Sequence, residues 1–192
     1  MNKIKTTRGL LDAVLMAAAL GLVACGGGSE GGDTGGTQGV GANNEYSKMD
    51  NTCGESDFDG KALAIINAYR AAGATCGDTY FPPAKPLIWN QSMRNAALVH
   101  SLDMAKIGVS PGSHTGSDGS DAGTRMQRQG YDASQNYWGE GLGVGYSDIS
   151  FMLNGQLNSP PHCKSLMSKN YARVGVSCSA SDKKYVTINY GG

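Results

Sequence analysis

The sequence predicts an α+β domain, because helical segments precede and follow a small, mostly antiparallel sheet. Three patterns carry this prediction: apolar residues recur at helical spacing in four segments, glycines alternate along one strand, and two alternating segments close the chain as a hairpin. Of the 192 residues, 16 are Lys or Arg and 16 are Asp or Glu. With this balance and no basic stripe, nucleic acid is not an expected partner.

The four helices are placed by periodicity and by their end signals. The first covers residues 59–72 and stops at Gly73, after which three prolines at 82, 83 and 86 exclude regular structure. Asn90 caps the second helix, residues 91–107, which Gly108 ends. A short helix over 123–129 and a fourth over 148–158 complete the set.

The strands follow from period-two patterns. Residues 139–145 alternate glycine with Glu140, Leu142 and Val144, so one face of this strand has no side chains and admits a close neighbour. Residues 172–178 and 185–190 also alternate, and residues 179–183 supply the turn between them.

The first 24 residues have the order of an export signal. Lys3, Lys5 and Arg8 precede an apolar run over 13–24 that is too short to span a bilayer. The run ends in Leu-Val-Ala before Cys25, which resembles the lipobox of bacterial lipoproteins and implies acyl chains on the Cys25 thiol. The alternative is a plain secretory signal with an accidental cysteine. We therefore expect a lipoprotein signal peptide over 1–24 and a membrane anchor at Cys25.

A Gly-rich segment follows, so residues 25–52 are expected to be a lipidated cysteine and a disordered tether. The stretch 26–41 holds a single aliphatic residue, Val40, and cannot bury enough apolar area to offset chain entropy. A coil of this length reaches roughly 30 Å. A purely solubilising leader would have the same sequence. The globular domain is expected over 53–192.

The four remaining cysteines predict two disulfides, because an even number in an exported domain favours pairing. Three pairings are open. The local one joins Cys53 to Cys76 and Cys163 to Cys178, and it is the pairing that we expect.

Candidate functional residues are few, since the chain has only three histidines. His114 and His162 occur in Pro/Gly/Ser-rich segments, whereas His100 lies inside a helix and is expected to pack or to be hydrogen-bonded. Glu140 shares its strand face with aliphatic residues and needs a partner if it is buried. Phosphate-loop, serine-hydrolase elbow and zinc-protease motifs are absent from the sequence.

Several segments, taken in order, resemble one family. They are residues 67–70, 86–90, 96–104, 113–119, 125–131, 139–140, 158–163 and 173–176. Together they look like the bacterial branch of the CAP superfamily, also called SCP domains (cysteine-rich secretory proteins, antigen 5 and pathogenesis-related 1). The resemblance covers residues 59–190.

The resemblance implies an α-β-α sandwich and a cleft made by His114, Glu140 and His162. In some family members such a cleft binds a divalent metal, so His114 and His162 are candidate ligands of Zn²⁺. The family's second glutamate corresponds to Ser159 in this chain, so any metal binding is expected to be weak.

The expected function is a lipid-anchored, extracytoplasmic binding protein of the bacterial envelope. Its ligand would be a lipid, an envelope glycan or another protein. The alternative is a metal-assisted, protease-like hydrolase, in which the histidines hold Zn²⁺ and Glu140 acts as general base.

Overall fold

The computed structural model describes residues 45–108, 113–134, 137–181 and 183–192. Every described residue belongs to a single compact unit. The expected signal peptide, Cys25 and most of the expected tether therefore lie outside the described residues. None of the described helices combines the length and the apolar character needed to cross a membrane.

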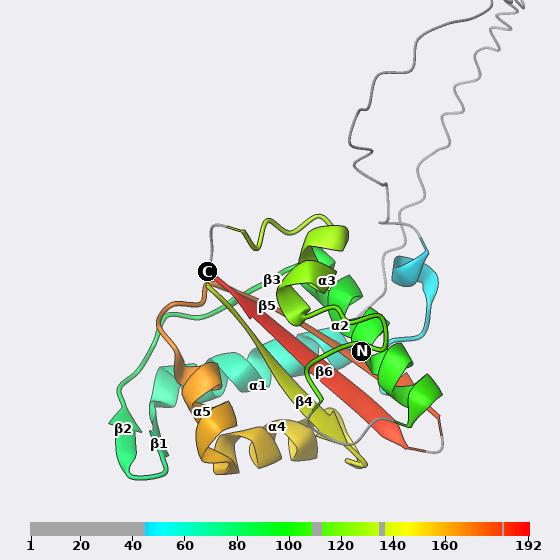
Figure 1. The fold of residues 1–192 in the computed structure, drawn as a ribbon. Helices are drawn as coiled ribbons and strands as arrows, with labels where there is room; N and C mark the ends of the chain where they lie inside the picture. Colours follow the sequence, from blue (N-terminus) through cyan, green and yellow to red (C-terminus); the bar gives the residue numbers. More distant parts are fainter. Residues whose placement is uncertain (1–44, 109–112, 135–136, 182) are drawn as a thin grey trace, which may run out of the picture. The chain divides into compact units, whose positions relative to one another are not determined.

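The described chain alternates helices with short and long strands (Figure 1). The helices are η1 (Tyr46–Lys48), α1 (Phe58–Ala72), α2 (Gln91–Ile107), α3 (Ala122–Arg128), α4 (Ile149–Asn158) and α5 (Pro160–Met167). The strands are β1 (Ala74–Cys76), β2 (Thr79–Phe81), β3 (Ile88–Trp89), β4 (Trp138–Val144), β5 (Arg173–Ala180) and β6 (Lys184–Gly191).

The main sheet has the strand order β3-β5-β6-β4. Strands β5 and β6 form an antiparallel hairpin in which Val176 lies opposite Ile188, and β4 pairs antiparallel with the other edge of β6. Only the two-residue β3 runs parallel to its neighbour, β5. The expected α+β class and the mostly antiparallel sheet are confirmed.

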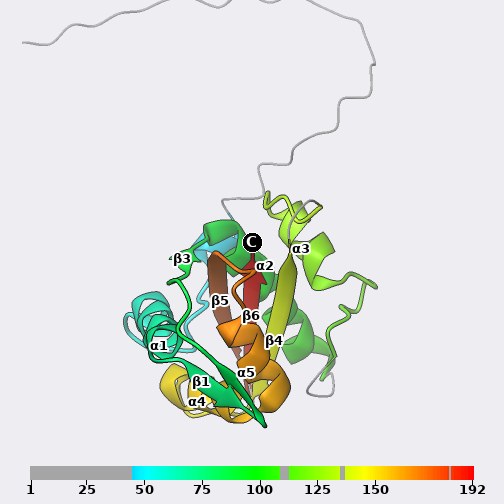
Figure 2. The same ribbon diagram turned by 90° about the vertical axis from the view of Figure 1, so that its left-hand side faces the viewer.

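The sheet is the middle layer of three (Figure 2). Helices α1, α4 and α5 lie on one side of it, and α2 and α3 lie on the other, which confirms the α-β-α sandwich. The main core fills the first side, where Ile66, Leu153 and Ile188 are fully buried. On the second side α2 lies directly on small and polar residues of the sheet, and a Cβ at Gly175 would overlap the backbone of Arg94.

Helix α2 has the predicted bounds, residues 91–107. The Asn90 side chain accepts a hydrogen bond from the Met93 amide at 2.9 Å, which satisfies one free donor of the first turn. Gly108 ends the helix with a left-handed backbone (φ 61°), which costs glycine little. The three other predicted helices and the three predicted strands are present, with bounds that differ by one or two residues.

Five short elements were not predicted: η1, β1, β2, β3 and α5. Residues 74–81 form the small hairpin β1–β2, which lies beside α5 (Figure 1). The segment containing His162 was taken for a loop, but it is the first turn of α5. Pro160 and Pro161 occupy the first two helical positions, where the missing N–H groups have no intrahelical partner to lose.

The disulfides are present, but the expected pairing is wrong. Cys53 is bonded to Cys178, and Cys76 is bonded to Cys163. The reason is tertiary: the chain before α1 runs along the end of β5, where the Cys178 amide donates to the carbonyl of Asn51 at 2.7 Å. Cys53 is therefore placed against Cys178, although 125 residues separate them.

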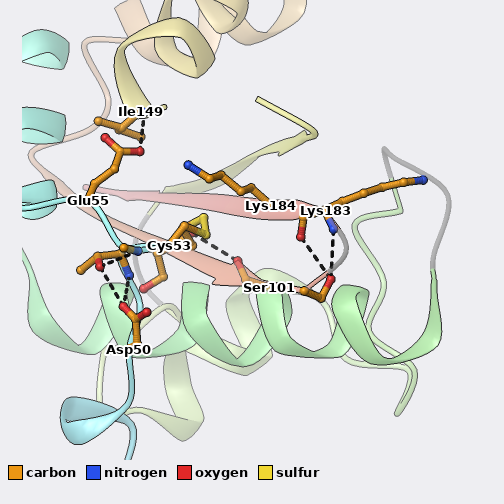
Figure 3. The surroundings of a disulfide bond; sticks show 12 residues. Asp50, Cys53, Glu55, Ser101, Ile149, Lys183 and Lys184 are labelled. Atoms are coloured by element: carbon orange, nitrogen blue, oxygen red, sulfur yellow. Dashed lines mark hydrogen bonds between the residues drawn. A yellow bond between two sulfur atoms is a disulfide. The ribbon is translucent and has the colours of Figure 1, made fainter. Parts of the chain in front are cut away.

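Around the Cys53–Cys178 disulfide, the segment before α1 contacts elements that are distant in the sequence (Figure 3). Glu55 accepts a hydrogen bond from the first amide of α4, at Ile149, over 2.9 Å. Packing begins before the disulfide, since Asn51 is buried and Arg94 donates to the Tyr46 carbonyl at 2.7 Å. Residues 45–52, expected to belong to the tether, contact the domain at these points.

Candidate functional site

Strand β4 sets the direction of Glu140. Its glycines face the side of α4 and α5, where a Cβ at Gly141 would meet Gln156 and a Cβ at Gly143 would meet Met152. Glu140 and Leu142 therefore point to the opposite side, toward α2 and α3. The side-chain-free face was predicted from the alternation, and it is confirmed.

The Glu140 carboxylate is buried, with its side chain 2% exposed, and both of its oxygens have partners. Arg125 Nη2 donates to Oε2 at 2.7 Å, and His114 Nδ1 donates to Oε1 at 3.0 Å. His100 Nε2 lies 3.9 Å from Oε1. A buried carboxylate requires such cations and donors, so the predicted need for a partner is met.

Arg125 comes from the short helix α3 and organises the loop before it. Asp121 caps this helix by accepting from the Thr124 amide at 2.7 Å. Arg125 Nη1 then donates to the Ser120 carbonyl at 2.7 Å, while Nη2 donates to the His114 carbonyl at 3.2 Å. The same guanidinium thus pairs with Glu140 and fixes the backbone that carries His114.

His114 is the accessible member of this cluster, because 52% of its side chain is exposed. The hydrogen bond to Glu140 raises the pKa of His114 above its ordinary value, and the charge of that carboxylate adds to the effect. Partial burial and the charge of Arg125 act in the opposite direction. The imidazolium form therefore persists to higher pH than in an ordinary histidine.

His100 supports the cluster from α2. Its Nε2 donates to the Ser113 carbonyl at 3.0 Å, so it is hydrogen-bonded and buried as predicted. Burial lowers the pKa of His100. This histidine consequently acts as a neutral donor that holds the loop next to His114.

His162 occupies the third position of α5 and is held differently. Its Nδ1 lies 3.0 Å from Ser159 Oγ, and the neighbouring Cys163 is bonded to Cys76. Burial lowers the pKa of His162, and the charge of His114 lowers it further. The two imidazoles therefore influence each other, but the direct partner of His162 is Ser159 and not Glu140.

The model of the CAP family, described as the cysteine-rich secretory protein family, matches residues 63–190, about two thirds of the chain. The chain belongs to the CAP family. A comparison with curated protein sequences gave no match.

The solved structures that resemble this CAP domain include two bacterial proteins. One is an extracellular protein of Bacillus anthracis that contains an SCP domain, with 27% sequence identity and a TM-score of 0.55. The match covers 69% of this chain but only 39% of that protein. The other is an outer surface protein of Borrelia burgdorferi, with 19% identity and a TM-score of 0.53, covering 68% of this chain and 92% of that protein. The second likeness concerns the fold alone.

Sequence reasoning did not identify Arg125 as a member of the cluster in this CAP domain. Its signal was indirect: a carboxylate among aliphatic residues requires a cation, and Arg125 follows the His114 loop. The cluster also adjoins a cavity of about 280 Å³, which Arg125 helps to line together with Asp103, Lys106 and Ser117.

The expected Zn²⁺ site has two candidate ligands, His114 and His162. In the described part of the CAP domain, no three His, Cys, Asp or Glu side chains come close enough together to hold a metal ion. His114 and His162 each have a ring nitrogen, Nε2, that makes no hydrogen bond within the described residues. Binding of Zn²⁺ through this pair stays a prediction, and weak binding is what two ligands provide.

Proposed function

We propose that this chain is an exported CAP-domain binding protein that holds an anionic group of its ligand at His114, with His162 beside it. The observation that carries the proposal is the full engagement of Glu140: both oxygens are bonded, and the side chain is 2% exposed. A general base must reach its substrate or a water molecule. Glu140 is instead suited to hold the imidazole of His114 in place and to favour its protonated form.

The charges of the cluster favour an anionic ligand group. Arg125 and Glu140 offset each other, so protonation of His114 leaves one net positive charge at the exposed member. A carboxylate, phosphate or sulfate on a lipid, an envelope glycan or a protein would complement this charge. Because the pKa of His114 is raised, the charge persists to higher pH than in an ordinary histidine.

Export and anchoring form the second part of the proposal. Two disulfides favour an oxidising compartment, and the two similar structures are described as extracellular and outer-surface proteins. The lipobox-like sequence before Cys25 suggests an acyl anchor. Fractionation of cells expressing Cys25→Ser tests this part: release to the soluble fraction is expected, and unchanged membrane retention would contradict the anchor.

The binding role is tested with the mature protein immobilised and exposed to a detergent extract of bacterial envelopes. Mass spectrometry then compares the wild type with His114→Gln and with Lys61→Gln, an exposed position on α1. We expect acidic molecules to be retained by the wild type and by the Lys61 variant, and to be lost with His114→Gln. Retention should weaken as the pH rises through the folded pKa of His114.

Equal retention by all three proteins would refute a site at His114. The enzymatic alternative is tested on the same proteins, with peptide and ester substrates in the presence of Zn²⁺. Turnover that is lost in Glu140→Gln would replace the binding proposal by a hydrolase. Calorimetry with Zn²⁺ should show weak binding by the wild type and none by the His114→Ala, His162→Ala double variant.

A further inference from the structure

A second cavity, of about 640 Å³, lies between the Pro-rich loop before β3 and the segment that joins α5 to β5. Its volume is typical of sites for small organic molecules. Its lining includes Pro83, Lys85, Pro86, Ile88, Lys169 and Tyr171. We call it the 83–88/169–172 groove. It shares no lining residue with the cluster around Glu140.

Arg70 holds the two walls of this groove together. From α1, its Nε donates to the Lys85 carbonyl at 2.7 Å, and its Nη1 donates to the carbonyls of Leu166 and Ser168 at 2.7 and 2.9 Å. The first carbonyl belongs to the Pro-rich wall, and the other two belong to the end of α5. Arg70 is fully buried, so the groove is fixed by internal bonds before any ligand arrives.

The charge of Arg70 is compensated by carbonyl dipoles alone. Among the salt bridges of the described residues, none involves Arg70. Two exposed lysines, Lys85 and Lys169, add to the positive charge of the walls, and no Asp or Glu lines the groove. Even with a terminal carboxylate on the lining residue Gly192, the net charge of the walls stays positive.

The remaining surface of the groove is largely apolar. Ile88 is 67% exposed and contributes apolar surface to the lining. Pro83 and Pro86 add rigid apolar surface. Tyr171 is held in place by stacking on Tyr190, with ring centroids 5.3 Å apart.

We propose that the 83–88/169–172 groove is a binding site for a small organic anion with an apolar body. The acidic group would face Lys85 and Lys169, and the apolar part would lie against Ile88, the prolines and Tyr171. The fixed walls and the one-sided charge support a preformed site for a soluble molecule. This site is independent of the function proposed for His114.

The proposal is tested with two dyes that share an apolar body. The anion 8-anilinonaphthalene-1-sulfonate carries a sulfonate, and N-phenyl-1-naphthylamine lacks it. Fluorescence titration of the mature protein should give saturable binding of the anion, at least about fivefold tighter than the uncharged dye, and binding should weaken with added salt. Lys85→Glu and Lys169→Glu should each weaken binding of the anion by about 5- to 30-fold, since each substitution reverses one charge.

Lys61→Glu is the matched control, because it makes the same charge change at an exposed residue that does not line the groove. It should leave binding of the anion within about twofold of the wild type. Amide chemical-shift changes in the wild type should be largest for residues 83–88 and 169–172. Ile88→Ser should weaken binding of both dyes, because it removes apolar contact surface and no charge.

Equal affinity for the two dyes, or no effect of the lysine reversals, would overturn the proposal. So would loss of binding in His114→Ala, which would place the anion at the other cluster. Binding to vesicles containing phosphatidylglycerol without binding of the dye would replace the soluble molecule by a membrane surface.

Discussion

Replacing Arg125 by Met should destabilise the domain strongly, because it leaves the Glu140 carboxylate buried without its cation. Both side chains are 2% exposed, so solvent does not screen their interaction. Removal of one partner from such a pair costs about 3–5 kcal/mol. The low end applies here, because His114 still donates to the other oxygen of Glu140. The lost bonds to the carbonyls of Ser120 and His114 add roughly 1 kcal/mol each.

The expected total is about 5 kcal/mol, which corresponds to a fall in the melting temperature of roughly 10–20 °C for a domain of this size. The assay is urea denaturation with the disulfides intact. Arg128→Met is the control, since it makes the same substitution on the same helix in an exposed pair with Asp118. That variant should lose no more than about 1 kcal/mol.

A double-mutant cycle with Glu140→Gln isolates the pair itself. The double variant should be about 2 kcal/mol more stable than the sum of the two single losses predicts, because neither charge is then left alone. A loss below 1 kcal/mol for Arg125→Met, or a coupling close to zero, would refute the argument that Arg125 compensates the buried carboxylate.

Three other predictions concern pH, packing and cross-links. The pKa of His114 should lie above the ordinary histidine value in an NMR pH series and should return toward that value in Glu140→Gln. The stability that the His114–Glu140 bond contributes is then complete below about pH 6.5 and is lost as the pH rises through the folded pKa of His114. An unshifted His114 would contradict its bond to Glu140. Gly175→Ala should unfold the domain or cost several kcal/mol in urea, because the new methyl group overlaps the backbone of α2; a neutral variant would show that α2 lies farther from the sheet. Replacing Cys76 and Cys163 by Ala should cost roughly 4–5 kcal/mol from loop entropy, and non-reducing peptide mapping of the wild type should recover this bonded pair.

Much of the fold could be predicted because its signals are local. Helix α2 needs only Asn90 at its start, Gly108 at its end and a repeating inward stripe, and all of these lie within the segment itself. The same holds for the alternating strands β5 and β6. The missed elements have weak local signals: η1, β1 and β2 have three residues each, β3 has two, and the two prolines of α5 are as typical of a loop as of a first helical turn.

Part of the candidate site could also be predicted. The glycines of β4 define one face of the strand, so Glu140 had to point to the other face and find a partner there. The identity of that partner, Arg125, depends on where α3 packs, and the sequence does not contain this information in any one segment. For the same reason, the sequence did not show that His114 alone of the two candidate histidines reaches Glu140, whereas His162 bonds to Ser159, three residues earlier in the chain.

The sequence by itself determined the class of the fold, the bounds of its long helices and the inward direction of Glu140, because each follows from periodicity over a few neighbouring residues. Only the tertiary structure decided which cysteines meet. Cys53 pairs with Cys178 because the chain before α1 lies along β5, although loop length favoured a nearer cysteine. Contacts between distant segments depend on the packing of whole elements, and that packing also made Arg125 the cation of the site and Arg70 the link between the walls of the groove.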